Sequence, residues 1–304
     1  MSMRRFSTPP PITIGLPVYN GEDHLHEAID SILRQTYTDF QLIISDNGST
    51  DATEEICREA ASLDKRVRYI RHYSNNGGAW NFNYVASSAD SPLFRFAADD
   101  DLLTPTLLEE CIEMRAQERQ AVLWYPRTVE IDADGNDIRE FPDSLELRDE
   151  YPHRRLREFC DKYENSNALF GLIRHETLMS TRLHGRYRSA DIVLLAELAL
   201  RGRFIEVPKP LFMRRWAERS TAQHRTQDEI NQWFDPDQGR YHHWVRTRLF
   251  YEMPRCILQA PIPLQERVLS LKEFYSSWIP RHGRGLLGES KQGLLRFAGR
   301  VLER

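Results

Sequence analysis

The chain has 304 residues, of which 40% are apolar and 28% are charged, so it is long enough to bury a substantial core in one or two domains. No apolar run approaches the length of a membrane span, and the start of the chain lacks the apolar stretch of a secretory signal. Four scattered cysteines without a CxxC spacing exclude a disulfide framework and a zinc site, so we expect a protein of the reducing cytoplasm.

The net charge of −4 conceals an acidic first half and a basic second half. Residues 1–152 carry 14 Lys and Arg against 28 Asp and Glu, whereas residues 153–304 carry 27 against 17. This asymmetry bears on the partners of the protein and not on its fold. The basic residues are mostly arginine, which suits contacts with phosphate and carboxylate groups, although genome composition is an equal explanation.

The first third of the chain alternates between extended and helical patterns. Apolar runs predict strands at 12–16, 40–44, 67–70 and 93–97, and helical spacing predicts helices at 21–34, 51–62, 76–88 and from 104. Such alternation with short links predicts an α/β fold, with a Rossmann-like, mostly parallel sheet and helices on both faces. Ligands bind sheets of this kind beyond the carboxyl ends of the strands.

The pattern changes beyond residue 120. Residues 122–131 predict a strand that leads to a hairpin turn at Asp134-Gly135, and the polar stretch 141–165 predicts irregular structure. Further predictions are a helix at 190–201, strands at 204–207 and 211–215, and a helical, aromatic-rich extension from about residue 228.

A polar loop follows each predicted strand of the first third. The loops read PVYNGE at 17–22, SDNGSTD at 45–51, NNGG at 75–78 and DDD at 99–101. Each loop alone is also typical of a turn or a helix cap, but four of them at one edge of a parallel sheet predict a binding site. Clustered carboxylates need a positive partner, and Mg²⁺ or Mn²⁺ bridging them to phosphate oxygens is the partner we expect.

Two other classes of nucleotide-binding protein find no support in the sequence. The first predicted strand is not followed by a GxGxxG turn, which disfavours a dinucleotide-binding protein. The chain also lacks a GxxxxGK[ST] loop, which disfavours a P-loop phosphotransferase.

Taken together, the four loops resemble those of the family 2 glycosyltransferases of GT-A fold. The stretches PVYNGEDHL, SDNGSTDAT, NNGGAWNFN and AADDDLLTP carry this resemblance, which covers residues 10–125 well and extends weakly to about residue 220. The resemblance implies an inverting enzyme that moves a sugar from a UDP or dTDP donor to a hydroxyl of a glycan or lipid-linked glycan, with Mn²⁺ or Mg²⁺ on the diphosphate. It also implies a donor-binding half at 1–125 and an acceptor-binding half of the same domain at 126–225, and the helical pattern that follows predicts an extension at 226–304.

The same resemblance implies roles for residues of the donor site. Asp46 corresponds to the acid that reads uracil or thymine. Asp100 and Asp101 correspond to the metal ligands, but the common Asp-x-Asp-Asp form would place an acid at Ala98, so the choice among the three carboxylates stays open. The implied nucleotide-binding residues are Pro17, Tyr19, Asn20, Glu22, Asp46, Asn47, Asn76, Gly77 and Asp99.

For the second half of the chain, the resemblance implies a catalytic base and a basic loop. Asp191 matches the residue that takes the proton from the acceptor hydroxyl, and a simple helix cap is the alternative. Arg214, Arg215 and Trp216 are expected to contact the diphosphate or the acceptor, although the family's usual His is missing there. A solvated basic loop is the alternative.

The end of the chain leaves two interpretations open. Residues 278–304 carry six Lys and Arg against two Glu, with apolar residues near helical spacing. Such a helix either lies on an anionic membrane at its inner face or packs on the main domain or in a homodimer. No nucleic-acid partner is expected.

Two alternative functions of the whole chain stay open. One is a non-catalytic module that binds a sugar nucleotide or a glycan. The other is a sugar nucleotidyltransferase, which is disfavoured because residues 15–22 lack the Gly-rich basic phosphate loop of that class.

Overall fold

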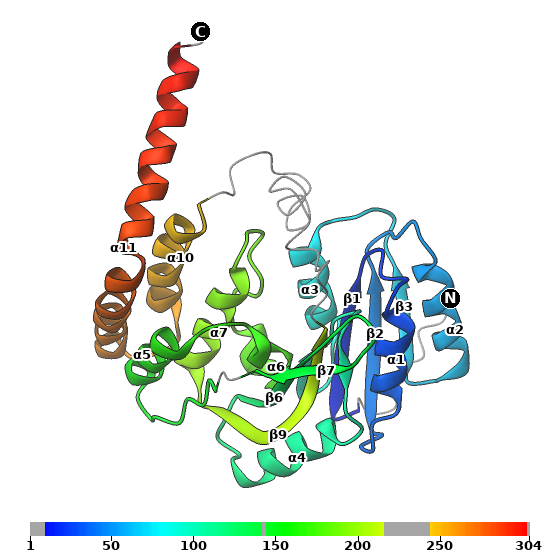
Figure 1. The fold of residues 1–304 in the computed structure, drawn as a ribbon. Helices are drawn as coiled ribbons and strands as arrows, with labels where there is room; N and C mark the ends of the chain where they lie inside the picture. The colour runs from blue at the N-terminus through cyan, green and yellow to red at the C-terminus, as the bar shows by residue number, and fades with distance from the viewer. Residues whose placement is uncertain (1–9, 142–143, 216–243, 303–304) are drawn as a thin grey trace.

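The computed structural model describes residues 10–141, 144–215 and 244–302, with side chains described up to residue 289. Within these ranges one nine-stranded sheet has the strand order β3-β2-β1-β4-β8-β6-β9-β5, with β7 paired to β6 (Figure 1). The strands are β1 (Ile12–Val18), β2 (Phe40–Asp46), β3 (Val67–Arg71), β4 (Leu93–Phe96), β5 (Leu102–Leu103), β6 (Leu123–Ile131), β7 (Asp137–Glu140), β8 (Leu172–Arg174) and β9 (Phe204–Arg215).

The helices of the described residues follow or connect these strands. They are α1 (Leu25–Leu33), α2 (Thr53–Leu63), α3 (Gly78–Ser87), α4 (Leu107–Gln117), α5 (Pro152–Lys162), the 3₁₀ turn η1 (Asn167–Phe170), α6 (His175–Met179), α7 (Ala190–Arg201), α10 (Val245–Gln259) and α11 (Leu264–Leu302).

The predicted parallel sheet is present in the first third of the chain. Strands β3, β2, β1 and β4 pair in parallel, so their carboxyl ends meet at one edge. The rest of the sheet is mixed: β6 and β9 are parallel, while β8, β7 and β5 pair antiparallel with their neighbours. The polar loops singled out in the sequence therefore lie at a common edge.

Both faces of the sheet are covered by helices, as predicted. Alternating residues of β2 point to opposite sides, since Leu42 and Ile44 belong to the core under α1, α2 and α4, whereas Ile43 belongs to the core under α3 and α7. Helices α10 and α11 form an outer layer that packs on α7 and α5, and the end of α11 extends beyond the body of the molecule (Figure 1).

Three expectations for the second half need correction. The stretch 141–165 is not irregular throughout, because α5 occupies Pro152–Lys162, with Pro152 at its first turn and Leu156 and Phe159 buried. The two strands expected at 204–207 and 211–215 are one strand, β9, whose register with β6 shifts near its middle. The short elements β8 and α6 were not expected. The predicted helical extension is confirmed from residue 245, and residues 228–243 lie outside the described residues.

Candidate active site

The loops after β1 and β2 are joined by reciprocal hydrogen bonds. The backbone N–H of Thr50 donates to Asn20 Oδ1 at 2.9 Å, and that of Ala52 donates to Glu22 Oε2 at 2.9 Å. In return the N–H of Asn20 donates to Ser49 Oγ at 3.0 Å. Asn20 has φ of 53°, a left-handed conformation that Asn tolerates. Asn20 and Glu22 therefore fix the shape of the two loops.

Asp46 ends β2 with its carboxylate turned into the protein. Its oxygens accept the N–H of Ser49 at 2.8 Å and the O–H of Tyr69 at 2.8 Å, and the residue has no exposed surface. Burial, together with this bond to Asp46, raises the pKa of Tyr69. Pro17 is buried within β1, and Tyr19 lies half-buried just beyond it.

Asn47 connects the loop after β2 to the start of α3. Its Oδ1 accepts the N–H of Asn76 at 3.0 Å, while its Nδ2 donates to Asn75 Oδ1 at 2.9 Å and to the carbonyl of Gly77 at 3.2 Å. Gly77 has φ of 90°, which a residue with a Cβ rarely adopts. The structure thus brings Asn47, Asn76 and Gly77 together, as the sequence predicts.

The acid triplet follows β4 and faces the loop after β1. A Cβ on Gly21 would lie 2.5 Å from Asp99 Oδ2 and 2.8 Å from Val18 Cγ2, so any other residue at this position would displace the Asp99 carboxylate. Asp100 is exposed at the surface. The protein around its carboxyl nevertheless raises the pKa of Asp100, although the positive charge of Arg214 acts to lower it. Asp101 is buried, and its Oδ1 accepts the N–H of Arg215 at 2.9 Å. Burial, with a further contribution from Asp100, raises the pKa of Asp101 to about 8.

Arg215 clamps the triplet to the rest of the fold. Its Nε donates to the carbonyl of Asp100 at 2.9 Å, its Nη1 to the carbonyls of Asp132 and Ala133, and its Nη2 to Glu27 Oε2 at 2.8 Å. The side chain is 1% exposed. The expected contact of Arg215 with a diphosphate therefore finds no support, because each guanidinium nitrogen already donates within the protein. Trp216 lies outside the described residues.

Arg95 is a further charged residue that the sequence analysis did not single out. It lies fully buried in β4, its Nη1 donates to the carbonyl of Phe96 at 3.0 Å, and its guanidinium carbon lies 5.5 Å from the centre of the Phe212 ring. Burial lowers its pKa to about 10, and the nearby Asp101 favours its charged form. The only signal in the sequence is an arginine inside the apolar run LFRF.

The candidate base, Asp191, lies half-buried in the first turn of α7. Ser166 Oγ donates to Asp191 Oδ2, and the next residue, Asn167, accepts at Oδ1 from Arg214 Nη1 at 2.7 Å. Arg214 also attracts Asp100 and Asp101. Two adjacent residues therefore connect the base predicted in the second half to the acid triplet of the first half.

Several polar atoms near Asp191 are buried without a hydrogen-bond partner among the described residues. They are Asn165 Nδ2, Asn167 Nδ2 and His184 Nε2. The ring of His184 packs against Phe82 and Phe96, at 5.1 and 5.6 Å between centres. Burial lowers the pKa of His184 to about 4 despite the opposing effect of Asp191. Unpartnered buried groups are rare in folded proteins, and a bound ligand would satisfy them.

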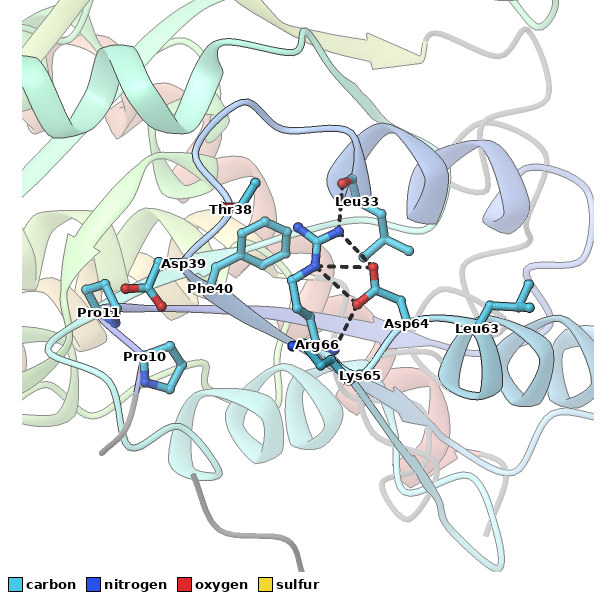
Figure 2. Close-up of a pocket in the computed structure, with 10 residues that line it drawn as sticks. All are labelled: Pro10, Pro11, Leu33, Thr38, Asp39, Phe40, Leu63, Asp64, Lys65 and Arg66. Atoms are coloured by element: carbon cyan, nitrogen blue, oxygen red, sulfur yellow. Dashed lines mark hydrogen bonds and ion pairs between the residues drawn. The ribbon is translucent and has the colours of Figure 1, made fainter. Parts of the chain in front are cut away.

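The opposite edge of the sheet holds an open groove of about 850 Å³ (Figure 2). Figure 2 shows Arg66 between Phe40 and Asp64 in this groove. The guanidinium stacks on the Phe40 ring at 4.6 Å and pairs with Asp64 at 2.7 Å. Since ligands of such sheets bind at the carboxyl edge, this groove is not the candidate active site.

The acid triplet fits a divalent cation only together with a phosphate ligand. Among the residues that the structure describes, no three His, Cys, Asp or Glu are arranged to hold a metal. Mg²⁺ sites on phosphates need only one or two carboxylates, and Asp100 with its neighbour Asp99 would supply these hard oxygen ligands. Asp101 is less suited to bind a metal because it is buried against the backbone of Arg215.

A parallel α/β sheet that carries an acid triplet after β4 at its carboxyl edge is the arrangement of a GT-A fold. The family model described as "Glycosyl transferase family 2" matches residues 13–177, which is just over half of the sequence, and the chain belongs to that family.

Solved structures share the fold at low identity. S. aureus TarS 1-349 in complex with UDP-GlcNAc has a TM-score of 0.63 at 15% identity, over 89% of this chain and 74% of that chain. The mannosyltransferase PcManGT from Pyrobaculum calidifontis, in complex with GDP-Man and Mn²⁺, has a TM-score of 0.53 at 15% identity, over 97% of this chain and 81% of that one.

Curated relatives match a shorter stretch. Glycosyltransferase GlyA of Streptococcus pneumoniae is 34% identical over 109 residues, which is 34% of this chain and 16% of the relative. An uncharacterized glycosyltransferase of Haemophilus influenzae is 33% identical over 130 residues, or 43% of this chain and 52% of the relative. The match thus spans at most about half of these two relatives. Among the described residues, no helix combines the length and apolarity needed to cross a membrane.

Proposed function

We propose that the protein transfers a sugar, with inversion, from a UDP or dTDP donor to a hydroxyl of a glycan or lipid-linked glycan acceptor. The observation that carries the proposal is the path from Asp191 through Ser166 and Asn167 to Arg214, which ends at Asp100. These contacts support the proposal that a group suited to activate a hydroxyl and a group suited to hold a metal–diphosphate serve the same site. Family membership and the sugar nucleotides bound by the two solved structures support a nucleotide-sugar donor.

The donor would lie over the loops at the carboxyl edge, with the nucleoside near Tyr19 and Asn76. Asp46 would act on the base indirectly, by holding the loop at Ser49 and the hydroxyl of Tyr69, because its own carboxylate has no exposed surface. Asp100 and Asp99 would hold Mn²⁺ or Mg²⁺. When bound, this ion offsets the charge that develops on the departing diphosphate.

Arg214 would place a second positive charge beside the diphosphate, since it lies next to the acid triplet and is held by Asn167. Arg215 and Asp101 would act as positioning residues, because they fix the backbone of the triplet without facing solvent. The buried guanidinium of Arg95 favours the charged form of Asp101, but burial outweighs it and keeps the pKa of Asp101 raised.

Asp191 would take the proton from the attacking acceptor hydroxyl. Ser166 holds Oδ2, which leaves Oδ1 for the acceptor, and the amino end of α7 stabilises the carboxylate. A fixed carboxylate on the acceptor side suits attack from the face opposite the leaving diphosphate, and such attack inverts the anomeric centre.

Thermal unfolding with UDP, dTDP and GDP, each with and without Mn²⁺, tests the donor half of the proposal. We expect UDP or dTDP to raise the Tm, with a larger shift when Mn²⁺ is present. Asp100→Asn should lose the part of the shift that depends on Mn²⁺, whereas the exposed Asp90→Asn should keep it. If GDP were the only nucleotide to raise the Tm, the assignment of a uracil or thymine base would be contradicted. If no nucleotide raised the Tm, the donor site would be overturned.

A further inference from the structure

Exposed apolar side chains are concentrated on the two outer helices, α10 and α11. Of the eleven large apolar side chains exposed in the described part of the chain, six lie on this helical pair. Their exposed fractions range from 48% for Ile279 to 72% for Leu264. These six residues are Tyr251, Leu258, Leu264, Val268, Ile279 and Leu287.

Most of these side chains form one apolar stripe on each helix. At 100° per residue, Leu264, Val268 and Ile279 fall within about 60° of one another around α11. Tyr251 and Leu258 are seven residues apart and share one side of α10. Phe250, next to Tyr251, packs against Tyr275 and Trp278 of α11 at 5.7 Å between ring centres, and so joins the two helices.

The charges on the same helices are sorted by sign. Between residues 244 and 289 every exposed charged side chain is basic, namely Arg246, Arg248, Arg255, Lys272, Arg281 and Arg284.

The acids of this segment are instead half-buried or buried and are engaged with the protein. Glu252 pairs with Arg182 at 2.8 Å, Glu266 with His153 at 2.8 Å and Glu273 with Arg157 at 3.1 Å. Glu289 accepts the N–H of Thr247 at 2.9 Å. The outer surface of the hairpin therefore combines apolar side chains with positive charge.

Basic residues lie within the apolar stripes themselves. Lys272 follows Val268 by four residues on α11, and Arg255 follows Tyr251 by four on α10. The sequence continues this bias, since residues 290–304 carry four Lys and Arg against one Glu. Helices with an apolar side bordered by Lys and Arg are typical of binding in the interface of an anionic membrane.

Two partners could cover this surface, a second copy of the chain or an anionic bilayer, and the positive charge of the surface favours the bilayer. A symmetric contact with a second copy would place the same patch on both sides, and Arg255 and Lys272 would then face like charges. An anionic bilayer offers the opposite charge and an apolar layer just below it. The packing of α10 on α7 and of α11 on α5 would hold this surface in a fixed orientation relative to the active site.

We propose that the outer surface of the α10–α11 hairpin, defined by Tyr251, Arg255, Leu258, Leu264, Val268, Lys272 and Ile279, docks the protein on the surface of an anionic phospholipid bilayer. This proposal is independent of the proposed sugar transfer. It places the contact on α10 and the first half of α11.

Co-sedimentation of the full chain with vesicles tests the proposal. We expect the wild-type protein to bind vesicles of phosphatidylcholine with 30% phosphatidylglycerol and to bind pure phosphatidylcholine at least about tenfold more weakly. Binding to the anionic vesicles should weaken in 0.5 M NaCl, because salt screens the contact.

Two double variants separate the contributions of charge and apolar area. Arg255→Glu with Lys272→Glu should lower the partition coefficient on anionic vesicles at least about tenfold, given about fivefold for each basic residue. Leu264→Ser with Val268→Ser should lower it on the same vesicles by removing apolar area. The matched control, Leu63→Ser with Lys65→Glu, changes an exposed pair at the far edge of the sheet and should bind as the wild type does.

Three results would overturn the proposal. They are no binding to anionic vesicles, equal loss in the control and the test variants, and a lipid-free dimer that dissociates in the Leu264→Ser, Val268→Ser variant by light scattering. The last result would assign the surface to a homodimer. If the serine variant does not fold, the charge variant alone still decides, because both of its positions are exposed.

Discussion

At the scale of single residues, the site depends on side chains that hold other side chains. Ser166 fixes one oxygen of Asp191, Asn167 fixes Arg214, and Arg215 fixes the backbone of the acid triplet. Hydrogen bonds to charged groups each contribute about 1.5–3 kcal/mol, so these residues restrict the positions of the reacting groups. The proposed mechanism needs this order, because an error of about 1 Å in position costs about a hundredfold in rate.

His184 gives a prediction about pH. Its pKa of about 4 in the folded protein lies below the value of about 6.5 expected after unfolding, so the unfolded chain binds more protons between these pH values. The stabilisation from the neutral ring is therefore complete above pH 6.5 and is lost as the pH falls toward 4. We expect a loss of about 2 kcal/mol, which allows for the part of the ring that reaches solvent.

Urea unfolding at pH 7 and pH 4.5 measures this loss. His184→Gln should reduce the difference in unfolding free energy between the two pH values by about 2 kcal/mol, whereas His26→Gln, at an exposed position, should leave it unchanged. If the unfolding free energy changed by the same amount between pH 7 and pH 4.5 in the wild type and in His184→Gln, the His184 ring would not be held neutral by the fold.

At the scale of elements, the loop after β1 must lie directly against the acid triplet. Gly21→Ala would place a Cβ 2.5 Å from Asp99 Oδ2 and would displace this carboxylate. We expect the affinity for UDP in the presence of Mn²⁺ to fall about tenfold by calorimetry, which is about 1.4 kcal/mol of binding free energy, with the fold retained. Gly288→Ala has nothing within 4 Å and should bind UDP as the wild type does. Unchanged affinity in Gly21→Ala would remove Asp99 from the site.

The first third of the fold could be predicted because its signals are local. Strands such as Phe40–Asp46 are short apolar runs, and their polar loops follow directly in the sequence. Helix α5 was missed because its sequence is polar and one of its buried residues is Arg155, whose Nε donates to the carbonyl of Ala199 at 2.7 Å. Nothing near Arg155 in the sequence indicates that partner.

The same limit applies to the site. The motifs predict roles for Asp191 and the acid triplet, but they do not predict the residues that hold these side chains in place. Ser166 lies 25 residues from Asp191, and Arg215 lies 114 residues from Asp101, so only the fold shows that they bond. The resemblance implies that Arg215 contacts the diphosphate or the acceptor, whereas the fold buries its side chain.

At the scale of the whole molecule, the charge asymmetry of the sequence separates two surfaces. The carboxylates of Asp99 and Asp100 belong to the carboxyl edge of the sheet, where a metal–diphosphate is proposed to bind. The exposed basic residues of α10 and α11 lie on the outer helical layer (Figure 1). In this account the molecule rests on a lipid surface with one side while its active site lies at the edge of the sheet.

The central claim is that Asp191 activates the group that attacks a nucleotide sugar, and release of nucleotide from UDP- or dTDP-sugars in the presence of Mn²⁺ tests it most directly. Water serves as the acceptor, so the assay needs no knowledge of the natural one. Asp191→Asn should slow the release at least about a hundredfold, as expected for loss of a general base, while the thermal shift with UDP and Mn²⁺ stays unchanged. Release at the wild-type rate in Asp191→Asn, with donor binding retained, would contradict the account.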